Sequence, residues 1–318
     1  MGYRILISCI QLQDTFDRYE QTFNDRDIQV DRPKITQQLS ESELIEIIAQ
    51  YDGVIAGDDF FTRKVFEAGK KLKIVAKWGV GVDNIDQLAA KELGIEVINT
   101  PNMFADEVSD AAMGYILLLA RGQHIVDAAV RSGVWKKIRG NTLRGKSIGV
   151  IGLGYIGQAV VTRAIAFGMI PHGFDIMAPP KDFLSATELK FLTLNKLYQT
   201  VDYLVLCCNL TEGNHHMINS EAFALMKDGV RIVNVARGPL IDEKALLAAL
   251  NSGKVGGAGL DVFESEPLSI DHPFKKLENC ILGSHNGSNT VEGVIRTNER
   301  AIHNLFNGLE LDWQEVSQ

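Results

Sequence analysis

Three polar residues that could carry out chemistry follow apolar, strand-like segments in the second half of the chain. Arg237 comes after Asn-Val-Ala, Glu266 comes before Pro, and His285 comes after Gly-Ser. Open α/β sheets bind ligands at the carboxyl ends of their strands, so we expect these side chains to meet there. A guanidinium can hold a carboxylate, an imidazole can take a hydroxyl proton, and a neighbouring carboxylate can orient the imidazole and favour its charged form. Together they would suit the oxidation of an alcohol beside a carboxylate.

Each of the three residues also has a purely structural interpretation. Arg237, followed by Gly, could cap a strand end, and Glu266 could lie in a solvated turn. His285 could bond to the polar backbone around it. The catalytic interpretation rests on their occurring together, each at the end of a strand.

A glycine-rich segment at 147–157, Ser-Ile-Gly-Val-Ile-Gly-Leu-Gly-Tyr-Ile-Gly, predicts a buried strand, a tight turn and the start of a helix over 156–167. Such glycines permit the sharp turn, the close approach of a pyrophosphate and tight helix packing, and the helix N-terminus favours negative charge. Asp175 can accept hydrogen bonds from a ribose diol, and no Arg follows it to neutralise a 2′-phosphate, so the cofactor is predicted to be NAD rather than NADP. The candidate cofactor contacts here are Gly152, Gly154, Tyr155, Ile156, Gly157 and Asp175.

The composition of the 318-residue chain is that of an ordinary globular protein, with 46% hydrophobic and 23% charged residues, and its length predicts two domains. A net charge of -8 without a Lys/Arg cluster disfavours binding to nucleic acid or to an anionic membrane. The first residues do not resemble a targeting segment, so a cytoplasmic location is expected.

The four cysteines have no CxxC spacing and lie in or beside apolar runs, which predicts buried free thiols. A metal site at His215 and His216 near Cys207 and Cys208 is the alternative. Adjacent residues of an extended chain point to opposite faces, so no metal is expected.

Strands and helices alternate along the chain, which predicts an α/β fold with two parallel sheets, the second doubly wound. In the first part, strands are expected at 3–8, 53–56, 73–77 and 95–99, and helices at 14–23, 41–50, 62–68 and 84–93. After the glycine-rich segment, strands are expected at 203–207, 231–235, 258–262 and 280–282, with helices at 220–226 and 243–251. Hinges are expected beside Pro101 and at 286–290, and a last helix over 291–309 could return to the first domain.

Five motifs in this order resemble the D-2-hydroxyacid dehydrogenase family, near its 3-phosphoglycerate dehydrogenase branch. They are Gly-Val-Gly-Val-Asp-Asn at 79–84, Gly-Leu-Gly-Tyr-Ile-Gly at 152–157, Asn-Val-Ala-Arg-Gly at 234–238, Asp-Val-Phe-Glu-Ser-Glu-Pro at 261–267 and Gly-Ser-His at 283–285. The resemblance spans nearly the whole chain. It implies hydride transfer between NAD(H) and a D-2-hydroxy acid or 2-keto acid.

The resemblance also implies particular roles. Arg237, Glu266 and His285 would be the catalytic residues, with His285 as the acid/base paired with Glu266. Further contacts would come from Val80 and Gly81 to the substrate carboxylate, and from Asp261, Ala236, Cys207 and His285 to the cofactor. An NAD-binding Rossmann domain, 102–289, would be inserted into a smaller flavodoxin-like substrate domain made of 1–101 and 290–318. The long helix after Pro101 would form the interface of a homodimer.

Two positions depart from the phosphoglycerate branch, which has Arg where this chain has Gly57 and Lys77. Lys77 could serve as a point charge, with Arg63, Lys136 or Arg139 nearby in sequence, but it lacks the bidentate fork of Arg. Phosphoglycerate is therefore one candidate among several, and the short stretch after His285 leaves no room for an appended regulatory domain.

Two other functions stay open. One is an NAD(H)-sensing binding protein, because transcriptional corepressors use the same fold, and fold alone does not decide function. The other is a dehydrogenase of a small anion such as phosphite or formate. The long tails or peptide groove that would favour a corepressor are not evident in the sequence, and the sequence does not identify the preferred acid.

Overall fold

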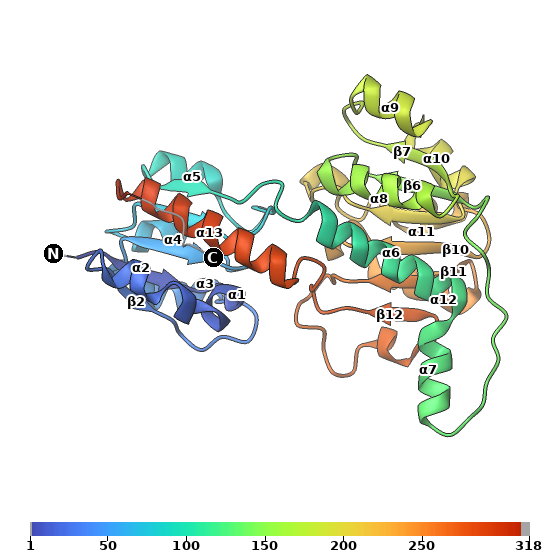
Figure 1. The fold of residues 1–318 in the computed structure, drawn as a ribbon, viewed down its shortest axis with the longest axis horizontal. Helices are drawn as coiled ribbons and strands as arrows, with labels where there is room; N and C mark the ends of the chain where they lie inside the picture. Colours follow the sequence, from blue (N-terminus) through green and yellow to red (C-terminus); the bar gives the residue numbers. More distant parts are fainter. Residues whose placement is uncertain (1, 313–318) are drawn as a thin grey trace. The chain divides into compact units, whose positions relative to one another are not determined.

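The chain folds into two compact units in a computed structural model that describes residues 2–312. The first unit combines Met1–Met103 with Asn289–Gln318, and the second is Phe104–Ser288 (Figure 1). The glycine-rich segment and the three candidate catalytic residues all belong to the second unit.

The first unit has a five-stranded parallel sheet in the order β2-β1-β3-β4-β5, the flavodoxin-like order. In chain order its elements are β1 (Arg4–Ile7), α1 (Ile10–Asp14), η1 (Phe16–Arg18), α2 (Glu20–Asn24), β2 (Gln29–Asp31), α3 (Glu41–Ile47), η2 (Ile48–Gln50), β3 (Gly53–Ala56), α4 (Arg63–Ala68), β4 (Ile74–Lys77), α5 (Gln87–Glu92), β5 (Glu96–Ile98) and α13 (Val291–Gly308). The last helix, red in Figure 1, packs on β3 and β4, so the C-terminal segment completes a unit that the N-terminal segment begins.

The second unit has a seven-stranded parallel sheet in the order β12-β11-β10-β9-β6-β7-β8. Its elements are α6 (Ala105–Arg121), α7 (Gln123–Arg131), β6 (Ser147–Ile151), α8 (Tyr155–Ala166), β7 (Ile170–Phe174), α9 (Lys181–Thr187), β8 (Lys190–Phe191), α10 (Leu194–Thr200), β9 (Tyr203–Leu206), η3 (Glu212–Asn214), α11 (Ser220–Leu225), β10 (Val230–Asn234), η4 (Gly238–Leu240), α12 (Glu243–Ser252), β11 (Val255–Leu260), η5 (Pro273–Lys276) and β12 (Cys280–Leu282). The chain leaves β6 toward β7 and returns to its other side at β9. The sheet is therefore doubly wound, with its switch point between β6 and β9.

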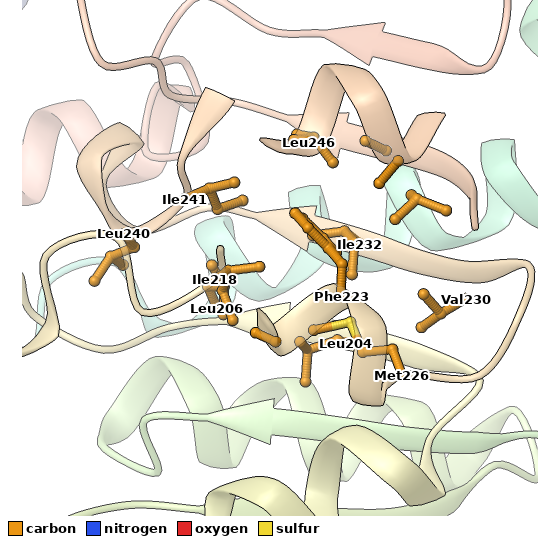
Figure 2. Close-up of a cluster of buried hydrophobic side chains, with 14 of the residues drawn as sticks. Leu204, Leu206, Ile218, Phe223, Met226, Val230, Ile232, Leu240, Ile241 and Leu246 are labelled. Atoms are coloured by element: carbon orange, nitrogen blue, oxygen red, sulfur yellow. The ribbon is translucent and has the colours of Figure 1, made fainter. Parts of the chain in front are cut away.

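Buried aliphatic and aromatic side chains hold the second sheet to its helices. In Figure 2 the labelled side chains come from β9, β10, α11, α12 and the segments between them. Phe223 of α11 and Leu246 of α12 are at most 3% exposed, and burying such a side chain stabilises the fold by about 1.5–3 kcal/mol. Close packing of this core thus holds in place the strands whose ends carry the candidate site.

Two predicted helices differ from the structure for local reasons, a capping side chain in one and a non-helical residue in the other. The predicted helix over 84–93 begins only at Gln87, because the Asp86 carboxylate accepts the Ala89 N–H and caps the helix there. The predicted helix over 14–23 is wrong as one helix. It is interrupted at Thr15, whose φ of -118° is not helical and whose hydroxyl donates to the Gln11 carbonyl oxygen.

Several short elements were not predicted, among them β2, α7, β8 and α10. The strand β2 is only three residues long and partly exposed, so it lacks the apolar run that marks a buried strand. No residue of α7 is buried. Within residues 2–312, no helix combines the length and the apolar character needed to cross a membrane.

Candidate active site

Two of the three glycines in the segment at 152–157 leave no room for a side chain, and the third leaves the backbone open. Gly152 has a φ of +90°, and a Cβ there would lie 2.5 Å from the Cys208 backbone nitrogen. A Cβ on Gly157 would lie 1.9 Å from the Gly152 carbonyl oxygen, so this glycine lets α8 pack on the turn. A Cβ on Gly154, the residue before α8, would meet no atom within 4 Å. The backbone is therefore open where an anion would approach the helix N-terminus.

Asp175 follows β7 and is tied to the same turn. Its Oδ2 accepts the Leu153 N–H at 2.6 Å, and its Oδ1 accepts the Met177 N–H at 3.3 Å. Ile176 and Met177 are 92% and 75% exposed, so apolar side chains rather than a cation follow the carboxylate. An acidic acceptor beside an open helix N-terminus fits the ribose and pyrophosphate of NAD, with Tyr155 and Ile156 forming the first turn of that helix.

The three candidate catalytic residues follow three adjacent strands. Arg237 comes after β10, Glu266 after β11 and His285 after β12, and these strands are neighbours in the sheet. All strands of the sheet are parallel, so their carboxyl ends lie on one edge, which also carries the turn after β6 and Cys207 after β9. The glycine-rich segment at 152–157 and the three candidate catalytic residues therefore lie at the same edge of the sheet.

Glu266 and His285 form a direct pair. The distance from His285 Nδ1 to Glu266 Oε2 is 2.8 Å, and the two side chains are 25% and 20% exposed. Glu266 Oε1 accepts the Phe263 N–H at 2.9 Å, which fixes the carboxylate on its own loop. His285 has a φ of +54°, in the left-handed region that non-glycine residues rarely adopt. Such strain is typical of functional positions that the surrounding structure holds in place.

Arg237 lies in a turn that a buried amide organises. The Asn234 side chain accepts the Ala236 N–H and donates to the Arg237 carbonyl oxygen, and Asn234 is 1% exposed. The guanidinium is half-buried and donates from Nη1 to the Ala236 carbonyl oxygen at 2.9 Å. Sequence analysis did not single out Asn234. The feature of the sequence that could have identified Asn234 is its polar side chain at the end of an apolar strand.

Asp261 follows β11 and holds the loop that carries His285. Its carboxylate accepts the N–H groups of Asn286 and Gly287 and the hydroxyl proton of Tyr115, and its carbonyl oxygen accepts the His285 N–H. Sequence analysis missed Tyr115. Its signal was a phenol within an otherwise apolar helical run, since a buried tyrosine hydroxyl generally has a partner.

In the first unit, the predicted carboxylate-binding loop follows β4. Gly79 has a φ of +116° and exchanges hydrogen bonds with Thr100, and the Val80 carbonyl oxygen accepts from the Asn99 side chain. Among the residues that the structure describes, no acceptor is present for the N–H of Val80 or of Gly81. Two unpaired donors on a glycine-containing loop can bind an anion.

Lys77 ends β4 and is 3% exposed. Its ammonium group donates to Asp58 Oδ1 at 3.1 Å and to the Trp78 carbonyl oxygen at 2.8 Å. A substrate anion would have to compete with the Asp58 carboxylate for this charge. The predicted contact of Lys77 with substrate stays a prediction.

The cysteines are free, with Cys9 and Cys280 buried and Cys207 and Cys208 half-buried. Burial raises the pKa of Cys9 and of Cys280 to about 12 and that of Cys208 to about 11. These thiols are therefore protonated near neutral pH.

The expectation that the His215 and His216 side chains point to opposite faces is wrong. Their ring centroids are 3.9 Å apart, because a φ of +52° at His216 turns the chain. The His216 ring meets Glu264 Oε1 at 3.0 Å. In the part of the chain from 2 to 312, no three His, Cys, Asp or Glu side chains are grouped so as to hold a metal ion.

Comparisons with known proteins agree with this geometry. A sequence profile described as "D-isomer specific 2-hydroxyacid dehydrogenase, NAD binding domain" matches residues 113–287. The chain is 42% identical over 281 residues to a hydroxypyruvate reductase of Thermotoga maritima, covering 86% of this chain and 90% of that protein. It is 43% identical over 258 residues to a D-3-phosphoglycerate dehydrogenase of Methanocaldococcus jannaschii, covering 80% of this chain but only 49% of the relative.

A solved structure shows the same likeness across the whole chain. The D-lactate dehydrogenase of Aquifex aeolicus, crystallised with NAD and lactic acid, superposes with a TM-score of 0.85 at 25% identity. The match covers 96% of this chain and 95% of that one.

Proposed function

This chain belongs to the D-isomer specific 2-hydroxyacid dehydrogenase family and is an NAD-dependent oxidoreductase, and we propose that it reduces a small 2-keto acid without a phosphate group, with hydroxypyruvate as the leading candidate. The observation that carries the catalytic part is the 2.8 Å contact between His285 and Glu266, at the sheet edge that also carries Arg237 and the cofactor segment.

We propose distinct roles for these three side chains. His285 gives a proton to the keto oxygen during reduction and takes it from the hydroxyl during oxidation, from Nε2, because Nδ1 is engaged by Glu266. Glu266 orients the imidazole and stabilises its charged form. Arg237 holds the carboxylate and polarises the neighbouring oxygen. When bound, NAD(H) supplies or accepts the hydride.

The N–H groups of Val80 and Gly81, in the first unit, are proposed to bind an anionic group of the substrate. The unpaired state of these two N–H groups supports this assignment, because an unpaired amide donor gains most from an incoming carboxylate. Lys77 is proposed to steady this loop through the Trp78 carbonyl oxygen.

Three features of the first unit support an unphosphorylated substrate. Lys77 is paired with Asp58, and Arg63, a candidate for binding phosphate, is paired with Glu92 at 2.6 Å. Gly57 brings no charge, and a Cβ there would already lie 3.0 Å from the Ser8 carbonyl oxygen. A phosphate group is recognised best by bidentate Arg donors, and the cations near these positions are already neutralised.

A comparison of two keto acids tests this proposal. Hydroxypyruvate and 3-phosphohydroxypyruvate differ by the phosphate alone, and both are followed through NADH absorbance. We expect kcat/KM for hydroxypyruvate to be higher by about tenfold or more, the size of one missing charge-assisted hydrogen bond. Equal or higher kcat/KM for the phosphorylated acid would reject the proposed substrate class and favour phosphoglycerate oxidation.

We also propose that the enzyme is a cytoplasmic homodimer. The resemblance assigns the dimer contact to α6, and the residues at and after the end of the next helix, α7, support self-association as well, because Val130, Val134 and Trp135 are 45%, 55% and 84% exposed. Exposed apolar side chains that lie close together are typical of interaction surfaces. The free thiols agree with a reducing compartment.

A further inference from the structure

We propose that Tyr115, on α6, is a positioning residue that aligns the loop of His285 through the carboxylate of Asp261. This inference rests on the proposed role of His285 as acid/base and adds a residue to it. The argument uses contacts within the second unit only.

The first step is that Asp261 binds the backbone of His285 and of the two residues that follow it. The His285 N–H donates to the Asp261 carbonyl oxygen at 2.7 Å. The next two N–H groups along the chain, of Asn286 and Gly287, donate to the two carboxylate oxygens at 3.1 and 2.8 Å. Hydrogen bonds to Asp261 therefore help to maintain the strained φ of +54° at His285.

The second step is that Tyr115 holds Asp261. Its hydroxyl donates to Asp261 Oδ1 at 3.1 Å, the oxygen that also accepts the Asn286 N–H. Burial first, and the neighbouring carboxylate second, raise the pKa of Tyr115, so the hydroxyl stays protonated and remains a donor.

The third step is that two glycines leave space for the Tyr115 side chain. A Cβ on Gly259 would lie 2.7 Å from Tyr115 Cβ, and a Cβ on Gly283 would lie 2.2 Å from the Tyr115 oxygen and 2.3 Å from Asp261 Oδ1. Two glycines, on β11 and directly after β12, thus leave the space in which the phenol reaches the carboxylate. Any other residue at either position would displace the ring or the loop.

The fourth step is that packing alone does not fix this side of the loop. Tyr115, Asp261 and the loop residues Gly283, Asn286 and Gly287 border a pocket of about 430 Å³. Atoms that border open space have fewer van der Waals partners, so hydrogen bonds supply more of the restraint. The hydroxyl of Tyr115 supplies such a hydrogen bond from a side chain to that carboxylate.

Replacing Tyr115 by Phe removes the hydroxyl and keeps the ring. The matched control is Tyr198→Phe, since Tyr198 is a buried tyrosine of the same unit whose hydroxyl donates to the Met217 carbonyl oxygen instead. We expect Tyr115→Phe to lower kcat by about three- to tenfold with little change in KM for NADH, and Tyr198→Phe to leave kcat unchanged. Tyr115→Phe should have little further effect in an Asp261→Asn background, because it acts through that carboxylate.

Hydrogen exchange at the Asn286 and Gly287 amides gives a readout that does not need turnover. Both amides should exchange faster in Tyr115→Phe and at the wild-type rate in Tyr198→Phe. Wild-type kcat in Tyr115→Phe, or a loss of equal size in the Asp261→Asn background, would overturn the assignment. If the wild-type enzyme reduces no 2-keto acid, the proposed function fails on its own, and unchanged exchange in Tyr115→Phe would then overturn the positioning role.

Discussion

At the residue scale, we propose that the preference for NAD over NADP depends on Asp175. Its carboxylate lies beside the glycine turn, held by the Leu153 N–H, with no cation following it. A 2′-phosphate there would meet negative charge, whereas a ribose hydroxyl would donate to it.

Replacing Asp175 by Ala should therefore weaken the preference for NADH over NADPH. A lost hydrogen bond to a charged acceptor corresponds to about ten- to a hundredfold in kcat/KM for NADH, while kcat/KM for NADPH should hold or rise. Steady-state kinetics with both cofactors measure this. Discrimination that stays at the wild-type value would remove Asp175 from cofactor recognition.

Local constraints explain which site residues the sequence could reveal. The local backbone geometry requires glycine at positions Gly152 and Gly157, so their spacing can be recognised from the sequence alone. The burial of Lys77 against Asp58 and the reach of Tyr115 to Asp261 depend on contacts distant in sequence. Those relationships carry no short-range signature.

At the element scale, the order of strands and helices was predictable because apolar runs alternate with amphipathic segments. The strand at 280–282 was predicted with its observed bounds, and the last helix differs from its prediction by one residue. The break at Thr15 and the strand β2 were not predictable, because a single back-bonding hydroxyl is a weak signal and the sequence of β2, Gln-Val-Asp, contains no apolar run.

His172, on strand β7, should make the stability of the fold depend on pH. This residue is 4% exposed, and its Nδ1 lies 3.1 Å from the Ile170 carbonyl oxygen. Burial, with a smaller contribution from Lys190, lowers the pKa of His172 below its usual value of 6.5. The unfolded chain then binds this proton more readily than the folded one. The stability from neutral His172 is therefore present above about pH 6.5 and is lost as the pH falls.

We expect the melting temperature to fall between pH 7.5 and pH 5.5, and to fall less in His172→Gln. Each pKa unit of lowering corresponds to about 1.4 kcal/mol. Replacing the exposed His215 by Gln serves as the control and should keep the wild-type slope. An identical slope in His172→Gln would show that another group is responsible.

At the scale of the whole molecule, the proposed homodimer makes a prediction about exposed apolar residues. Replacing Val134 and Trp135 by Ser should shift the protein toward the monomer in sedimentation velocity, because the pair would lose buried apolar area at the interface. Ile270 is 86% exposed, and Ile270→Ser is the matched control. A wild-type sedimentation coefficient in the double variant would place the interface elsewhere.

The central claim concerns the whole enzyme and depends on His285, whose Nδ1 is held by Glu266 so that Nε2 can exchange the substrate proton. The most direct measurement follows NADH oxidation with hydroxypyruvate in the wild type and in His285→Ala, together with NADH binding by fluorescence. We predict that the wild type reduces hydroxypyruvate and that kcat falls by about 10²–10⁴-fold in His285→Ala. The affinity of the variant for NADH should equal that of the wild type. Equal kcat in the two proteins would contradict the account.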